Sequence, residues 1–194
     1  MVMTATTEDD ILRSARALLV GGGYNGFSYA DIATSVGIRK ASIHYYFPTK
    51  VDLVSRLVAR YREEAEAGFA DMARRHPDPL DQLRAYIGFW SDCILDGTNT
   101  FCLCALLATQ IPVLPEEVVA EVRAYFAMLS TWLAAVLDNG CKQGTFTLDD
   151  TAAAEAEKFM AAVHGAMLSA RAYGDGKVFA LVTEPLLDGL TARR

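Results

Sequence analysis

Residues 27–50 of the chain read FSYADIATSVGIRKASIHYYFPTK, and they predict two short helices joined by a tight turn. Ser28 can cap the first helix, and Asp31 three residues later completes a capping box near the positive end of the helix dipole. Gly37 stands where the turn between the helices needs a positive φ angle. The stretch therefore has the layout of a helix-turn-helix element.

The spacing of Ala33, Gly37 and Ile43 supports this layout. It places a small side chain where two helices cross, a glycine in the turn, and an apolar side chain that faces the first helix. A surface hairpin with a merely solvated polar face would show the same spacing. A nucleic-acid interface is favoured because cations and aromatic side chains gather on the exposed face, at Arg39, Lys40, His44, Tyr45, Tyr46, Phe47 and Lys50.

The charge of the chain is distributed unevenly. With 194 residues, 52% hydrophobic composition and a net charge of -6, the protein is globular and is not a generic basic nucleic-acid binder. Residues 37–62 hold six cations and one acid, a net charge of +5, so the rest of the chain carries -11. An acidic body with one basic end directs that end toward a polyanion.

The termini and apolar runs predict a cytoplasmic protein without a membrane segment. Residues 1–10 are acidic and lack the apolar core of a secretory signal. The longest charge-free run within a helical pattern covers residues 124–137, and its 14 residues are too few to span a bilayer.

Hydrophobic residues recur with a period near 3.6 along the whole chain, which predicts an all-α protein of about nine helices. Thr49 with Asp52 predicts the cap of the fourth helix, Thr100 that of the sixth, and Pro185 a kink in the ninth. One helix is expected over residues 8–20, two within residues 28–47, and six over residues 50–75, 79–96, 101–110, 115–142, 151–173 and 177–190.

The run from residue 27 to residue 53 resembles the amino-terminal domain of the tetracycline-repressor (TetR) family of transcriptional regulators. The resemblance covers about a quarter of the chain. The sequence differs from the family pattern at Arg39, Ala41 and His44. These differences are expected to change the DNA sequence that the protein reads. The matching residues are Phe27, Ser28, Ile32, Ala33, Gly37, Ile38, Lys40, Ser42, Ile43, Tyr46, Phe47, Pro48, Lys50 and Leu53.

The resemblance implies a homodimeric repressor that binds a palindromic double-stranded DNA operator and is released by a small, mostly apolar effector. The expected division is a DNA-binding helix-turn-helix domain over residues 1–49 and a larger effector-binding and dimerisation domain over residues 50–194. Docking logic makes Arg39 and Lys40 the first candidates for base contacts. Further expected DNA contacts are Ser42, His44 and Tyr45, and, by resemblance to phosphate-holding positions, Ser28, Tyr46 and Lys50.

Aromatic side chains of the second domain are the candidates for effector contacts. Stripes of aromatic residues at helical spacing form an ordinary core in most proteins, so their presence alone does not indicate a pocket. By resemblance, some of them are expected to line a cavity. The candidates are Trp90, Phe101, Phe126, Trp132 and His164. In the carboxy-terminal helices, small residues are expected to allow close helix approach at a dimer interface, at Ala161, Ala162, Gly165, Ala166 and Ala170.

The four cysteines lack metal-ligand spacing, and no metal or other cofactor is expected. Buried cysteines are usually unreactive, but a second interpretation makes Cys102 a thiol sensor of electrophiles or oxidants. An architectural DNA-binding protein without an effector is a third alternative. An enzyme is not expected, because the sequence has no phosphate-cradling glycine motif, no HExxH and no GxSxG.

Overall fold

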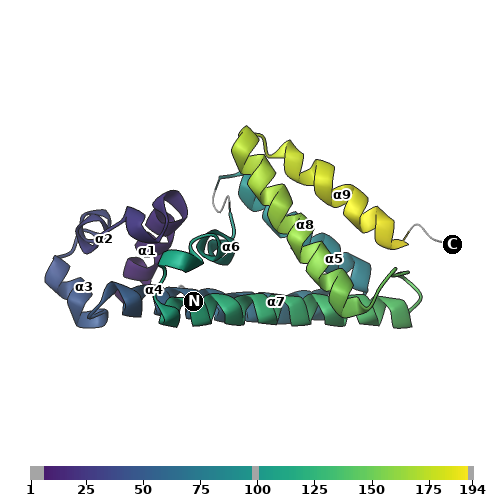
Figure 1. Cartoon of the computed structure of the whole chain (residues 1–194), viewed down its shortest axis with the longest axis horizontal. Helices are drawn as coiled ribbons and strands as arrows, with labels where there is room; N and C mark the ends of the chain where they lie inside the picture. Colours follow the sequence, from purple (N-terminus) through teal and green to yellow (C-terminus); the bar gives the residue numbers. More distant parts are fainter. Residues whose placement is uncertain (1–6, 98–100, 192–194) are drawn as a thin grey trace. The chain divides into compact units, whose positions relative to one another are not determined.

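A computed structural model describes residues 7–97 and 101–191 of the chain, and within these ranges it contains nine α-helices and no strands. The prediction of an all-α protein is therefore confirmed (Figure 1). The α-helices are α1 (Thr7–Gly22), α2 (Tyr29–Val36), α3 (Lys40–Tyr46), α4 (Lys50–Arg75), α5 (Pro79–Leu95), α6 (Leu103–Ala108), α7 (Glu116–Lys142), α8 (Ala152–Tyr173) and α9 (Lys177–Thr191), with short 3₁₀ helices η1 (Tyr24–Gly26) and η2 (Ile111–Val113).

The chain forms two compact units. The first consists of Met1–Glu63 with Leu103–Tyr125, and the second of Glu64–Cys102 with Phe126–Arg194. Helices α4 and α7 each contribute residues to both units. The sequence predicted a division by function, with a DNA-binding domain that ends at residue 49 and an effector domain that begins at residue 50. The two compact units are defined by packing and do not test this division, which stays a prediction.

The core of the first unit is built from apolar stripes that the 3.6-residue period places on one side of each helix. Helix α1 packs on α2 and α6, and α2 packs on α3 (Figure 1). Ile11 of α1, Ile32 of α2 and Ile43 of α3 are completely buried. Burying such a side chain contributes about 1.5–3 kcal/mol, so these three residues hold the short helices in place.

Local capping fixes where the helices of the first unit begin and end. The backbone N–H and the hydroxyl of Ser28 both donate to Asp31 Oδ2 at 2.7 Å, and these bonds hold the pKa of the Asp31 carboxyl below its usual value. Gly37 ends α2 with φ 76° and ψ 30°, a left-handed conformation that favours glycine. Thr49 and Asp52 form the equivalent cap of α4, with a bond of 2.9 Å from the Thr49 N–H. All three predicted features are confirmed.

The second unit contains α5, α8 and α9, with α8 and α9 lying side by side (Figure 1). Asp78 caps α5 by accepting the N–H groups of Leu80 and Asp81, and Gly174 turns the chain after α8 with φ 64°. Along α8 the small residues divide into two sets. Ala166 and Ala170 are buried within the chain, whereas Ala161 and Gly165 are exposed.

Two details differ from the sequence expectation. Helix α6 is six residues long, shorter than the expected span of residues 101–110, and its expected cap at Thr100 lies outside the described residues.

Helix α7 is long and apolar enough to cross a membrane by length and composition, with a mean hydropathy of 1.2 over 18 residues. This is weak evidence for a membrane segment, because the core helix of a soluble protein has the same composition.

Candidate nucleic-acid interface and ligand pocket

Helix α3 presents a cationic and aromatic face to solvent. Arg39 is the residue that precedes its first turn, and the side chains of Arg39 and Lys40 form no ion pair or hydrogen bond with any described residue. Tyr45 is 83% exposed, a high value for an aromatic side chain, and its ring meets that of Tyr46 edge-on with centroids 5.3 Å apart. A hollow of about 570 Å³ on this face is lined by Thr7, Ile38, Arg39, Ala41, Ser42, Tyr45 and Tyr46.

Tyr29 connects the start of α2 to the residues that follow α3. Its buried hydroxyl lies 2.9 Å from the carbonyl oxygen of Phe47 and 2.6 Å from that of Thr49. Burial, with Asp52 as a smaller cause, raises the pKa of Tyr29 to about 12, so the hydroxyl remains a donor. The sequence interpretation gave Tyr29 no role, although its position directly after the Ser28 cap was a usable signal.

His44 is held by two neighbours on the exposed face. Its ring packs against Tyr29 with 4.7 Å between centroids, and its Nδ1 lies 3.2 Å from the carbonyl oxygen of Pro48. A carbonyl can only accept, so this contact requires the proton on Nδ1 and leaves Nε2 as an acceptor in the neutral ring.

Two residues expected to hold phosphates have partners inside the first unit. The Lys50 ammonium donates to the carbonyl of Phe27 and lies 4.0 Å from the centre of the Phe27 ring. Partial burial lowers the pKa of Lys50, with Asp31 acting in the opposite direction. The Ser28 hydroxyl donates to Asp31, as described above. Their phosphate contacts stay a prediction.

The positive charge of residues 37–62 is partly neutralised by acids from elsewhere in the first unit. Arg60 forms an ion pair with Asp9, and Arg62 lies 3.5 Å from Glu121. Arg56 pairs with Glu63 at 3.1 Å. Because Arg39 and Lys40 have no such partner among the described residues, the excess positive charge is concentrated at the start of α3.

Gln110, which follows α6, holds the turn after α1. Its Oε1 accepts the backbone N–H of Tyr24 at 2.8 Å, across 86 residues of sequence. Gly23 has φ 76° and ψ -177°, a conformation essentially restricted to glycine, and a Cβ there would lie 2.2 Å from Gln110 Nε2. The Gln110 side chain therefore packs directly on the backbone of Gly23, a contact that no local sequence pattern indicates.

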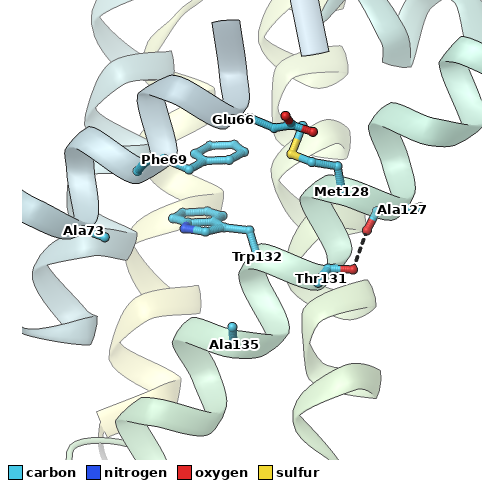
Figure 2. A pocket seen from close by; sticks show the side chains of 9 residues that line it. Glu66, Phe69, Ala73, Ala127, Met128, Thr131, Trp132 and Ala135 are labelled. Atoms are coloured by element: carbon cyan, nitrogen blue, oxygen red, sulfur yellow. Dashed lines mark hydrogen bonds between the residues drawn. The ribbon is translucent and has the colours of Figure 1, made fainter. Parts of the chain in front are cut away.

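A groove of about 540 Å³ lies between α4 and α7 within the second unit, and Figure 2 shows its lining. The rings of Phe69 and Trp132 are stacked in it with centroids 4.1 Å apart and planes 7° apart. Glu66 is the charged residue of the lining, and Thr131 donates to the carbonyl of Ala127 at 2.8 Å. The other lining residues are Ala70, Ala73, Met128 and Ala135.

The five residues predicted to contact the effector have different neighbours, which do not bring them together at one site. Trp132 lines the groove, and Phe126 packs against His164 with centroids 5.4 Å apart. Phe101 is buried beneath the Arg171 guanidinium, and Trp90 is buried against Phe89. Phe69 and Glu66 also line the groove and were not among the predicted contacts.

Three polar side chains of the second unit are buried without hydrogen-bond partners among the described residues. They are Tyr86, Trp90 and His164, and the atoms concerned are Oη, Nε1 and Nε2. Burial lowers the pKa of His164 to about 4, so the imidazole is neutral at pH 7. Burial also raises the pKa of Tyr86 above its usual range, with Cys102 as a smaller cause. The Trp90 indole beside the hydroxyl acts in the opposite direction, but the two groups do not meet in hydrogen-bond geometry.

All four cysteines are thiols, and Cys102 and Cys104 are completely buried. Across residues 7–97 and 101–191, no group of three or more His, Cys, Asp or Glu side chains could hold a metal ion. The thiol-sensor interpretation of Cys102 stays a prediction, and its burial makes access of a reagent dependent on an opening motion.

Comparison with known proteins gives consistent results. A sequence model of the family described as "Bacterial regulatory proteins, tetR family" matches residues 11–57. A crystal structure of a transcriptional regulator of the TetR family from Agrobacterium tumefaciens is 61% identical, with a TM-score of 0.93, covering 95% of this chain and 97% of that one.

Curated relatives match over shorter stretches. The IcaR negative transcriptional regulator of the icaADBC biofilm operon in Staphylococcus epidermidis is 26% identical over 126 residues, which is 65% of this chain and 64% of IcaR. The transcriptional repressor BepR of Brucella suis is 30% identical over 84 residues, 43% of this chain and 40% of BepR. This chain therefore spans less than two thirds of the length of either protein.

Proposed function

This chain belongs to the TetR family of bacterial regulatory proteins, and we propose that it is a repressor. The proposed repressor binds a palindromic operator as a homodimer and leaves it when a small, mostly apolar effector binds. The observation that carries the DNA-binding part is the exposed start of α3, where Arg39 and Lys40 have no protein partner among the described residues. Arginine at such a position can donate two hydrogen bonds to guanine O6 and N7.

Footprinting of the DNA upstream of the gene would identify the operator, and variants would test the assignment. Arg39→Ala should reduce the preference for operator over scrambled DNA by about tenfold to a hundredfold, the loss of one bidentate base contact. Arg84→Ala removes the same charge from an exposed arginine of the second unit and should leave the preference unchanged. Equal weakening on all sequences in Arg39→Ala would assign Arg39 to the phosphate backbone instead.

The groove between α4 and α7 supports the effector part of the proposal. Its volume of about 540 Å³ suits a small molecule, and its walls are mainly alanine, methionine and the stacked Phe69–Trp132 pair, with Glu66 and Thr131 as the polar residues. Ala73→Trp should fill the groove, keep operator binding and abolish release by compounds that release the wild type. Ala153→Trp, an exposed alanine of α8 outside the groove, is the matched control. Release that survives in Ala73→Trp would place the effector elsewhere.

The α8–α9 surface supports the homodimer. Ala161, Gly165 and Leu168 are exposed along one face of α8, and Leu181 of α9 is 73% exposed. Exposed small and apolar side chains on two adjacent helices fit a two-fold helix-to-helix interface. Leu168→Glu should shift the protein to monomer in analytical ultracentrifugation, whereas Val113→Glu, also at an exposed apolar residue, should remain dimeric.

A further inference from the structure

The second unit contains a buried pair of hydrogen-bonding groups on one face of α5. Tyr86 and Trp90 are four residues apart, so their side chains are neighbours on the helix, and each is only 2% exposed. Neither the Tyr86 hydroxyl nor the Trp90 indole N–H has a hydrogen-bond partner among the described residues. Buried polar groups are nearly always paired, so two adjacent exceptions indicate a missing acceptor.

Two rings that contact Tyr86 belong to the lining of the groove. The Tyr86 ring lies 5.4 Å from that of Trp132 and 6.0 Å from that of Phe69, measured between centroids. Tyr86 therefore packs against both members of the stacked pair that lines the groove between α4 and α7. Tyr86 thus lies behind the rings that line the groove, and Trp90 lies one turn further along α5.

The chemistry of the two groups defines what they can bind. The indole N–H is a donor only, and a tyrosine hydroxyl that keeps its proton is a second donor. An oxygen with two lone pairs can accept both hydrogen bonds. A charged acceptor would lose its hydration in this apolar surrounding, so a neutral oxygen is favoured.

We propose that Tyr86 and Trp90 form the polar recognition point of the effector site and bind the carbonyl oxygen of a neutral, otherwise apolar carbonyl compound. The inference rests on the proposed effector function and specifies the chemical class of the effector. Tyr86 and Trp90 supply the two hydrogen bonds, and the Phe69–Trp132 pair contacts the apolar body of the ligand.

The experiment compares acetophenone with α-methylstyrene, which has the same shape but a methylene group in place of the carbonyl oxygen. The full-length protein labelled with ¹⁵N has two indole N–H resonances, from Trp90 and Trp132, which Trp132→Phe assigns. Acetophenone should move the Trp90 resonance downfield and bind about five- to tenfold more tightly than α-methylstyrene, the effect of a net hydrogen bond. Tyr86→Phe should remove most of this preference, and Tyr173→Phe, an exposed tyrosine of the same unit, should retain it.

Several outcomes would overturn the proposal. These are equal affinity for the two probes, no saturable binding of acetophenone, or a carbonyl preference that Tyr86→Phe does not change. A Trp90 resonance already downfield in the free protein and unaffected by acetophenone would mean that the pair holds an internal water. Operator binding by the same proteins is measured separately, so a failed DNA-binding function and a failed carbonyl preference give different results.

Discussion

Two buried tyrosines, one in each unit, differ in what their hydroxyl groups contact. Tyr29 of the first unit lies between the carbonyl oxygens of Phe47 and Thr49, at 2.9 and 2.6 Å. Tyr86 of the second unit is buried more completely and has no hydrogen-bond partner among the described residues. The Tyr29 hydroxyl is thus satisfied by the backbone next to the helix-turn-helix. The Tyr86 hydroxyl is left available to a further partner, such as the proposed effector.

The largest expected effect concerns the contact between Gly23 and Gln110 inside the first unit. Gly23→Ala should destabilise the protein by about 2–4 kcal/mol, because alanine is strained at φ 76° and its Cβ displaces Gln110 from the Tyr24 N–H. Urea unfolding measures this loss, and operator affinity should fall with it. Gly21→Ala, where a Cβ meets nothing within 4 Å, should be neutral or slightly stabilising. A fully stable Gly23→Ala would show that the Gln110 contact is dispensable.

The buried His164 imidazole of the second unit should make the stability of the protein depend on pH. Its folded-state pKa of about 4 lies below the ordinary value of 6.5, so between these values the unfolded chain binds a proton that the folded chain does not. Stability should therefore be lost as the pH falls from 6.5 toward 4, by up to about 2–3 kcal/mol from this group.

The contribution of His164 is measured as a difference between variants, because acidic residues also titrate in this range. The stability difference between pH 7 and pH 4.5 should be smaller in both His164→Phe and His164→Gln than in the wild type. An unchanged difference in both variants would mean that folding does not lower the pKa of His164.

The two tyrosines provide the most direct form of the comparison. Tyr29→Phe removes the single O–H that the Phe47 and Thr49 carbonyls share and should cost about 1–2 kcal/mol. Tyr86→Phe removes a hydroxyl that has no partner and should be neutral or slightly stabilising in the absence of ligand. Thermal unfolding of both variants at one pH measures the two changes in stability. A similar loss in both would show that Tyr86 is hydrogen-bonded in solution.

The smallest effect concerns thiol access and involves no change in stability. Cys93 and Cys141 are half-buried, whereas Cys102 and Cys104 are completely buried. Mass spectrometry after brief labelling of the native protein should find the first two modified well before the others. Early modification of Cys102 would instead support the thiol-sensor interpretation.

Features determined by neighbours in sequence were predictable. The Ser28 and Thr49 caps and the Gly37 turn each depend on residues within four positions, and all appear where the pattern placed them. Features determined by distant residues were not. Gln110 lies outside the short α6 and is used by Tyr24, far away in sequence, and the Lys50 side chain is held by the carbonyl of Phe27.

The candidate effector site shows the same limit. Periodicity placed Trp90 on the buried stripe of its helix, and the family resemblance made Trp132 a candidate. Neither could show that Phe69 of α4 would stack on Trp132 of α7. Nor could they show that Tyr86 would be left without a partner, because satisfaction of a buried group depends on every element packed around it.

The contact between Gln110 and Gly23 has a consequence for protein engineering. A chimaera that joins this helix-turn-helix to the effector domain of another regulator could be cut directly after the helix-turn-helix, near residue 49. Such a chimaera would keep Gly23 and Tyr24 but would receive a foreign residue in place of Gln110, so the Tyr24 N–H would lose its acceptor. A head taken from this protein should therefore be transferred together with Gln110.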